Sequence, residues 1–207
     1  MMKKVFLLSA IVLCFSMIAN AQIKESFDSN SLEWTECPYD SDAGSAIITE
    51  GKMIVKSNGE KYFLGTMVGE TTVFETHCYM PIDIMKPFQI KSIVSVKNID
   101  DENVAGIIFN YKDKGTFYSF SINEDWVEFT RYVDGKIVGA ISQGIKWKKW
   151  KKVSMEWELI SDGSTLEFFI NGISMLKVRH MPLEYTGFGY CTVGDQELEV
   201  DEVTFIQ

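Results

Sequence analysis

Apolar and polar residues alternate with a period of two along most of the chain. In many short segments the apolar side chains share one parity, and polar side chains often occupy the other. Because successive side chains of a strand point to opposite faces of a sheet, this alternation predicts strands with one face on a core. The clearest segments are MIVKS, ETHCYM, QIKSIVSV, VAGIIFNY, TFYSFSI, VEFTRYV, KIVGAI, VSMEWEL, TLEFFI and ISMLKV.

Turn-forming dipeptides separate these segments. Asn or Asp followed by Gly tolerates the positive φ angles of tight hairpin turns. Such turns join VSMEWEL, LEFFI and ISMLKV into a three-stranded meander. A dozen or more strands exceed what one open sheet holds comfortably, so the sequence predicts an all-β, two-sheet antiparallel β-sandwich. The dipeptides are Asn58-Gly59, Asp134-Gly135, Asp162-Gly163 and Asn171-Gly172.

The last predicted strand, ELEVDEVTFI, changes register once along its length. Leu198 and Val200 share one parity, whereas Val203 and Phe205 share the other. An extra residue in one strand produces such a shift, so a β-bulge is expected near Asp201-Glu202.

The N-terminal residues have the features of a secretory signal peptide. Lys3 and Lys4 precede a short apolar run, which ends at Ala19-Asn20-Ala21. We expect cleavage after Ala21 and a single exported domain over residues 22–207, without a further membrane span. Because Leu13 stands before Cys14, where a lipoprotein signal has a small residue, lipid anchoring is not expected.

Charge and cysteine content narrow the possible partners. The chain has a net charge of −9, and loss of residues 1–21 would leave 18 basic and 29 acidic residues, a net charge of −11. Nucleic acid is therefore excluded as an expected partner. Cys37, Cys78 and Cys191 allow at most one disulfide, and their spacing fits no zinc or redox motif. His77 is expected to be a satisfied structural histidine.

The order of these features resembles the concanavalin A-like lectin/glucanase superfamily, in its laminin-G-like branch. The resemblance rests on FDSNSLEW, AGIIFNYKDKGTFYSFSI, EFTRYVDGK, WKKVSMEWELISDGSTLEFFINGISML and YTGFGYCTVGDQELEVDEVTF. Trp150, Asn171-Gly172, Gly187 to Gly189 and Asp201 to Val203 stand at the family's characteristic positions. The resemblance implies a jelly-roll fold. The family it points to includes bacterial exported domains of the 3-keto-disaccharide hydrolase type. Carbohydrate-binding modules, glycan-cleaving enzymes and adhesive modules share this fold.

One acidic strand imitates the catalytic pattern of the family's glucanases. Those enzymes carry a strand with the pattern E-x-D-x-E, in which the alternate acids lie on one face of the sheet and line one groove. Glu197, Glu199 and Asp201 have this spacing and are the catalytic candidates of the chain. The central acid is Glu instead of Asp, the strand closes the domain, and Asp201 falls at the expected bulge. We therefore favour a solvated acidic strand face over a catalytic group.

Several loop acids are candidate ligands for calcium, which some laminin-G-like domains bind. They lack the spacing of an EF-hand, so solvation in loops is the favoured interpretation, and no other cofactor is expected. These residues are Asp40, Asp42, Asp100, Asp101 and Glu102.

Sugar binding needs only an aromatic surface and a few placed polar groups. The candidate ligand-binding residues are Asn110, Tyr118, Trp126, Glu128 and Arg131, with Tyr111 beside them and Trp34 and Tyr39 as a possible rim. The interleaved lysines and tryptophans of WKKWKK, residues 147–152, are interpreted as a strand entrance, in which an exposed Trp147 would mark a sugar contact.

The sequence thus favours an exported, non-catalytic module that recognises carbohydrate in the envelope of a Gram-negative bacterium. Two alternatives stay open: a glycoside hydrolase or lyase, and a protein-interaction or adhesion module. An acidic pair 5 to 10 Å apart in a groove would favour the enzyme.

Overall fold

The computed structural model describes residues 22–41, 44–58, 74–145, 150–179 and 183–207; for 38–41 and 150–153 it describes the backbone alone. Within these ranges every helix or strand element is a β-strand, and no helix could span a membrane. The strands are β1 (Gln22–Glu25), β2 (Cys37–Ser41), β3 (Gly44–Thr49), β4 (Lys52–Ser57), β5 (Phe74–Tyr79), β6 (Phe88–Ile99), β7 (Val104–Asp113), β8 (Thr116–Ile122), β9 (Trp126–Val133), β10 (Lys136–Gly144), β11 (Trp150–Ser161), β12 (Thr165–Ile170), β13 (Ile173–Arg179), β14 (Gly187–Val193) and β15 (Glu197–Ile206).

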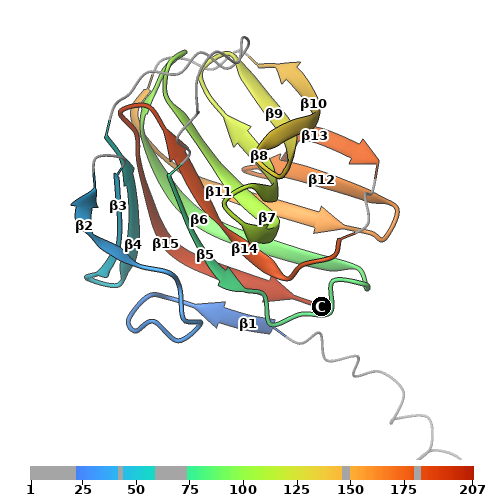
Figure 1. Ribbon diagram of the computed structural model, residues 1–207, viewed down its shortest axis with the longest axis horizontal. Helices are drawn as coiled ribbons and strands as arrows, with labels where there is room; N and C mark the ends of the chain where they lie inside the picture. Colours follow the sequence, from blue (N-terminus) through green and yellow to red (C-terminus); the bar gives the residue numbers. More distant parts are fainter. Residues whose placement is uncertain (1–21, 42–43, 59–73, 146–149, 180–182) are drawn as a thin grey trace, which may run out of the picture.

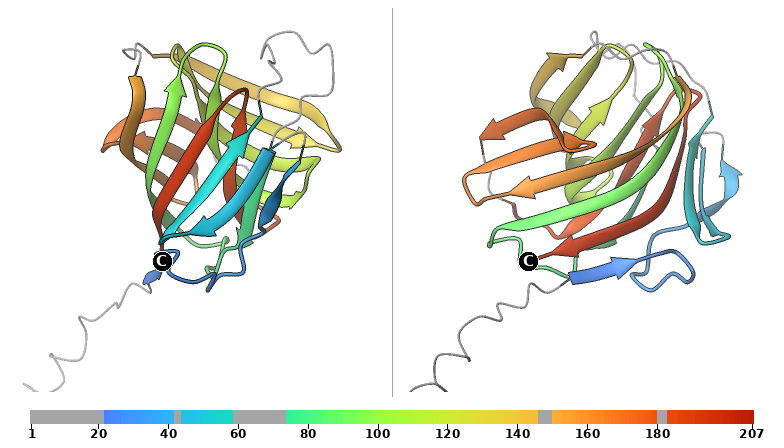
Figure 2. Two further views of the ribbon diagram at one scale, coloured as in Figure 1. Left: turned by 90° about the vertical axis from the view of Figure 1, so that its left-hand side faces the viewer. Right: turned by 180° about the vertical axis from the view of Figure 1, so that it is seen from behind.

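The strands form two antiparallel sheets that pack face to face, as the sequence predicts (Figures 1 and 2). The nine-stranded sheet has the order β13-β12-β11-β6-β15-β4-β3-β2, and β1 pairs with β15. The six-stranded sheet has the order β10-β9-β8-β7-β14-β5. The first and last strands of the described chain, β1 and β15, lie side by side in the larger sheet.

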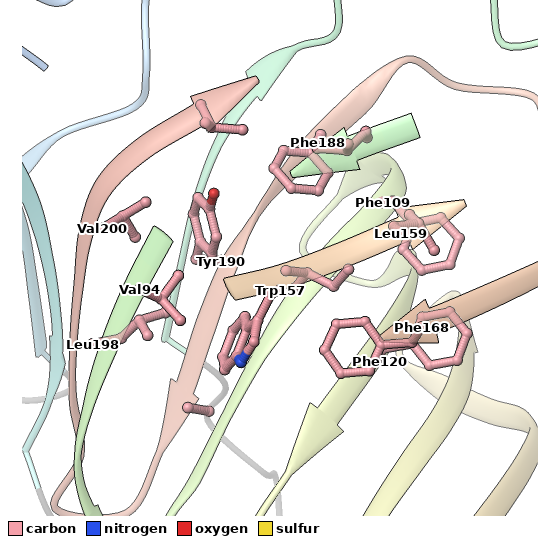
Figure 3. Close-up of a cluster of buried hydrophobic side chains, with 14 of the residues drawn as sticks. Val94, Phe109, Phe120, Trp157, Leu159, Phe168, Phe188, Tyr190, Leu198 and Val200 are labelled. Atoms are coloured by element: carbon pink, nitrogen blue, oxygen red, sulfur yellow. The ribbon is translucent and has the colours of Figure 1, made fainter. Parts of the chain in front are cut away.

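Aromatic side chains from both sheets meet in the core between them (Figure 3). Phe120 of β8 stacks on Phe168 of β12, with ring centroids 5.4 Å apart. Phe188 of β14 meets Phe205 of β15 edge-on at 5.6 Å. All four are buried, and each such side chain stabilises the fold by about 1.5–3 kcal/mol. The two sheets are therefore held at their inner faces, which leaves the outer face of each sheet as a place for function.

Local turn chemistry fits the predicted meander of β11, β12 and β13. Asn171 and Gly172 have φ angles of 51° and 74°, and the Asp134-Gly135 turn between β9 and β10 is similar, at 49° and 75°. Gly163 also has a positive φ, of 84°. Gly59 of the fourth predicted turn lies outside the described residues.

The predicted β-bulge near the C-terminus is confirmed. The register of β15 against β6 shifts between Val200 and Glu202, so Asp201 is the extra residue. The extra residue keeps the apolar side chains on both sides of the bulge pointing into the core. The fully buried residues are Leu198, Val200, Val203 and Phe205.

Candidate functional site

A second apolar cluster lies apart from the main core, on the outer face of the six-stranded sheet. It consists of Ile108, Tyr111, Phe117 and Cys191, with Tyr132 packed against it. Their neighbours along each strand, such as Ile107 and Tyr190, belong to the main core between the sheets. Side chains alternate between the two faces of a strand, so this cluster occupies the outer face.

Four stacked rings, which we name the aromatic row, cross this face from β5 to β9. His77 lies 4.1 Å from Tyr111, Tyr111 lies 6.2 Å from Phe117, and Phe117 lies 4.6 Å from Tyr132, as measured between ring centroids. The interplanar angles are 29°, 29° and 25°. The rings come from β5, β7, β8 and β9, so the row depends on the pairing of strands that are distant in sequence.

Glycine in β14 permits the close approach of the neighbouring strand. Gly189 pairs with His77 on one side and with Ile108 on the other. A Cβ atom at this position would overlap the backbone oxygen of Thr76. Only glycine therefore fits at this position next to β5.

Solvent reaches the aromatic row at its ends. Tyr111 and Phe117 are 6% and 4% exposed, whereas Tyr132 and His77 are partly exposed. Tyr79, whose ring lies 6.4 Å from that of His77, is 71% exposed. A ligand would therefore meet the row first at Tyr132 or at Tyr79 and His77.

A carboxyl group lies beside the row. The Tyr111 hydroxyl donates a hydrogen bond of 3.1 Å to Glu75. Burial raises the pKa of Glu75, while the Tyr111 hydrogen bond and the charge of Lys114 oppose the shift. Cys191 pairs with Glu75 in register, and burial together with the Glu75 charge raises the pKa of its thiol to about 12. Cys191 is therefore held as a thiol and not as a reactive thiolate.

The two ring nitrogens of His77 differ in their surroundings. Nε2 lies 3.4 Å from the Thr35 hydroxyl, whereas Nδ1 is buried without a hydrogen-bond partner among the described residues. Burial lowers the pKa of His77 and favours the neutral ring. The expectation of a satisfied structural histidine thus holds for one nitrogen only.

Polar side chains border the aromatic row on β8 and β9. Ser121 pairs with Glu128, and the Thr130 hydroxyl donates to Glu128 at 2.8 Å. Glu75 and Glu128 lie on one line of register, through Cys191, Gly106 and Ser121. Four strand spacings of about 4.8 Å separate the Cα atoms of Glu75 and Glu128 by roughly 19 Å.

The structure divides the sequence-predicted ligand residues between two faces. Alternation along β9 places Trp126 and Glu128 on the outer face with Tyr132. Tyr118 points into the core, where it meets Phe109 edge-on at 5.8 Å, and Arg131 shares its side of the sheet.

Asn110 has a structural role. Its φ angle is 51°, and it lies at an irregularity of β7. Its side-chain oxygen accepts hydrogen bonds from the backbone N–H groups of Glu184 and Tyr185, at 2.7 and 2.9 Å. Asn110 therefore positions segment 183–186 beside the sheet.

The acidic candidates of β15 lie among lysines on the nine-stranded sheet. Lys52 Nζ is 2.9 Å from Asp201 and 3.4 Å from Glu199. Lys97 contacts Glu197 and lies 3.8 Å from Glu199. Hydrogen bonding to Asp201 is the largest cause of the raised pKa of Lys52. The three acids thus form an ion-paired strand face, on the other sheet from the aromatic row.

Asp100 caps a turn. It accepts hydrogen bonds from the N–H groups of Glu102 and Asn103, at 3.0 and 2.8 Å, and from the Asn103 amide at 2.8 Å. The side chains of Asp40 and Asp42 lie outside the described residues. Among the described residues, no three His, Cys, Asp or Glu side chains are placed to hold a metal ion.

Other sequence candidates lie away from the aromatic row. The prediction that Trp34 forms part of a binding rim is wrong, because Trp34 is buried and stacks on Tyr190 with ring centroids 5.6 Å apart. Trp147 and the side chains of Trp150 and Tyr39 fall outside the described residues. Cys78 and Cys191 are buried free thiols.

Comparison with known proteins places the fold. No model of a known protein family matches the chain, and no curated protein matches its sequence. Solved structures match it over most of its length. The carbohydrate-binding module CBM66 from Bacillus subtilis has a TM-score of 0.52 and 15% identity, over 84% of this chain and 95% of that one.

Two further neighbours have the same architecture. The catalytic domain of an endo-1,3-β-glucanase (laminarinase) from Thermotoga petrophila has a TM-score of 0.58 and 10% identity, over 91% of this chain and 98% of that one. The Emp47p carbohydrate recognition domain has a TM-score of 0.57 and 10% identity, over 90% and 94%. The chain thus has the two-sheet jelly-roll fold of these neighbours, which confirms the expected fold class.

Proposed function

We propose that this protein is an exported, non-catalytic β-sandwich module that recognises glycans on the outer face of its six-stranded sheet. The observation that carries the proposal is the aromatic row. Sugar rings present C–H faces that pack on aromatic rings, and their hydroxyl groups need a few fixed acceptors. Tyr132 supplies a partly exposed ring, and Glu128, two strand positions from Thr130, supplies a carboxylate on the same face.

The named structural neighbours support a carbohydrate partner. Two of them are called a carbohydrate-binding module and a carbohydrate recognition domain, and they share this fold at low identity. Assignment to the laminin-G-like branch is part of the proposal. So are cleavage of residues 1–21, a single domain over 22–207, and a location in the periplasm or outside the cell.

A glycoside hydrolase is the second candidate. The raised pKa of Glu75 favours it, because a carboxyl group that keeps its proton can act as a general acid. The two carboxyl groups of a glycosidase lie about 5 to 9.5 Å apart. Glu75 and Glu128 are roughly 19 Å apart at Cα by strand spacing, which supports binding over cleavage on this face.

A glycan array, followed by incubation of each bound polysaccharide with the protein, tests both candidates. The proposal predicts saturable binding to at least one glycan and no released product. Release of oligosaccharides, with loss of release in Glu75→Gln, would replace it with the hydrolase. Absence of binding and of product would leave the protein-interaction alternative.

A further inference from the structure

Arg131 lies on the other side of β9 from the aromatic row, near the edge of the sandwich. Its Cα atom pairs with Tyr118 on β8 and with Gly139 on β10. β10 is an edge strand of the six-stranded sheet, and most of its side chains are exposed. Arg131 itself is partly exposed.

Among the described residues, the guanidinium group of Arg131 has an aromatic partner but no anionic one. It lies over the Tyr118 ring, with Cζ 5.3 Å from the centroid. Its Nε is buried and meets no hydrogen-bond acceptor among the described residues. A buried donor without an acceptor is costly, so a ligand that supplies an acceptor to this guanidinium group would be favoured.

Several lysines, unlike Arg131, have a carboxylate oxygen within 4 Å of Nζ. These are Lys24, Lys52, Lys86, Lys91, Lys97 and Lys177. No carboxylate of the described residues forms such a pair with Arg131, although the chain carries 29 acids. Within the part of the chain that the structure describes, Arg131 thus has no intramolecular ion pair.

Gly139 leaves room beside the aliphatic part of the Arg131 side chain. Of the atoms in the described residues, a Cβ atom at Gly139 would meet only the Cδ atom of Arg131, at 3.9 Å. Ile141, two residues along β10, is 51% exposed. The absence of a side chain at Gly139 thus leaves one flank of Arg131 open at the sheet edge.

We propose that Arg131, supported by Tyr118 and flanked by Gly139, binds the anionic group of a ligand. A guanidinium group presents a planar fork of N–H donors, which fits the oxygens of a carboxylate or a sulfate. Uronic acids carry the first of these groups and sulfated sugars carry the second. The site lies on the inner side of β9, so it does not depend on glycan binding by the aromatic row.

Arginine Nε–H groups give their own NMR signals, and Arg179 is the only other arginine in the sequence. The purified protein is titrated with sodium glucuronate and with sodium sulfate at constant ionic strength, with glucose as a neutral control. We expect the Arg131 Nε–H signal to shift saturably with one or both anions, while Arg179 and the glucose titration stay unchanged. The anion that binds more tightly identifies the carboxylate or the sulfate as the preferred group.

Two matched variants test the geometry. Gly139→Val fills the open flank and should abolish the saturable shift, whereas Gly144→Val, on the same strand, should leave it intact. In Arg131→Lys, binding is measured from the NMR signal of the Gly139 backbone amide. This variant should bind the anion about tenfold more weakly or worse, because it loses the planar N–H donors of the guanidinium group. An unmoved Arg131 signal, parallel shifts of Arg179, or equal effects of the two valine variants would overturn the proposal. Glycan binding at Tyr132 can fail without any of these outcomes.

Discussion

The imidazole of His77 lies face to face with the phenol ring of Tyr111, their centroids 4.1 Å apart. The hydroxyl of the same Tyr111 donates to the carboxyl group of Glu75. One tyrosine thus joins the stacked rings to the partly buried acid on the outer face of the six-stranded sheet. The pKa of Glu75 therefore depends on the position of the Tyr111 ring.

Tyr111→Phe should raise the pKa of Glu75 further. The hydroxyl stabilises the ionised carboxylate, and its loss leaves burial less opposed, while the phenyl ring still stacks on His77. Titration of the Glu75 carboxyl carbon by NMR measures the change. A pKa that stays in place or falls in the variant would show that the hydrogen bond is not formed in solution.

Glu75→Gln should change how stability depends on pH. Burial raises the pKa of Glu75 in the folded state, so the folded protein binds this proton more tightly than the unfolded chain does. The free energy of unfolding contributed by Glu75 therefore falls as pH rises from about 4.3 through the folded pKa. Relative to the wild type, the variant should gain stability over that range in urea unfolding experiments. A difference that is independent of pH would contradict the burial of this carboxyl.

Gly189→Ala should destabilise the six-stranded sheet by about 1–3 kcal/mol or more, because its Cβ would overlap the backbone of Thr76. Gly144→Ala is the matched control, since among the described residues the nearest atom to its Cβ would be the Asp125 oxygen, at 3.9 Å. Thermal unfolding followed by circular dichroism compares the two. Equal melting temperatures would show that β5 and β14 are not so closely packed.

Glu199→Gln tests the acidic strand of the other sheet. Glu199 is near both Lys52 and Lys97, so its neutralisation should lower the melting temperature. Because β15 belongs to the nine-stranded sheet, glycan affinity should stay within about twofold of the wild type. Calorimetric titration with an array-selected glycan measures this. Loss of binding with an unchanged melting temperature would show that Glu199 contacts the glycan.

The fold was accessible from sequence because its signals are local. Period-two alternation predicts the strands, Asn171-Gly172 predicts a hairpin, and the change of parity at Asp201 predicts the bulge. Trp34 shows the limit. It is buried because Asn30 binds both its N–H and its carbonyl oxygen and folds the loop inward, which no period reveals.

The aromatic row was harder to predict because it crosses strands. His77 and Tyr132 are far apart in sequence, and their relation depends on the order β5-β14-β7-β8-β9. The alternation along each strand nonetheless predicts part of the division between core residues and outer-face residues. Tyr118 shares its parity with the buried Phe120, whereas Glu128 shares its parity with Tyr132. That signal separates a core residue from an outer-face residue before the strand order is known.

The most direct test of the central claim is the affinity of Tyr132→Ala for a glycan selected on the array, measured by isothermal titration calorimetry. Phe169→Ala is the matched control, a partly exposed aromatic on the nine-stranded sheet. If the aromatic row binds the sugar, Tyr132→Ala should weaken binding about tenfold, and Phe169→Ala should leave it unchanged. Equal affinities of Tyr132→Ala and the wild type would contradict glycan recognition by this face.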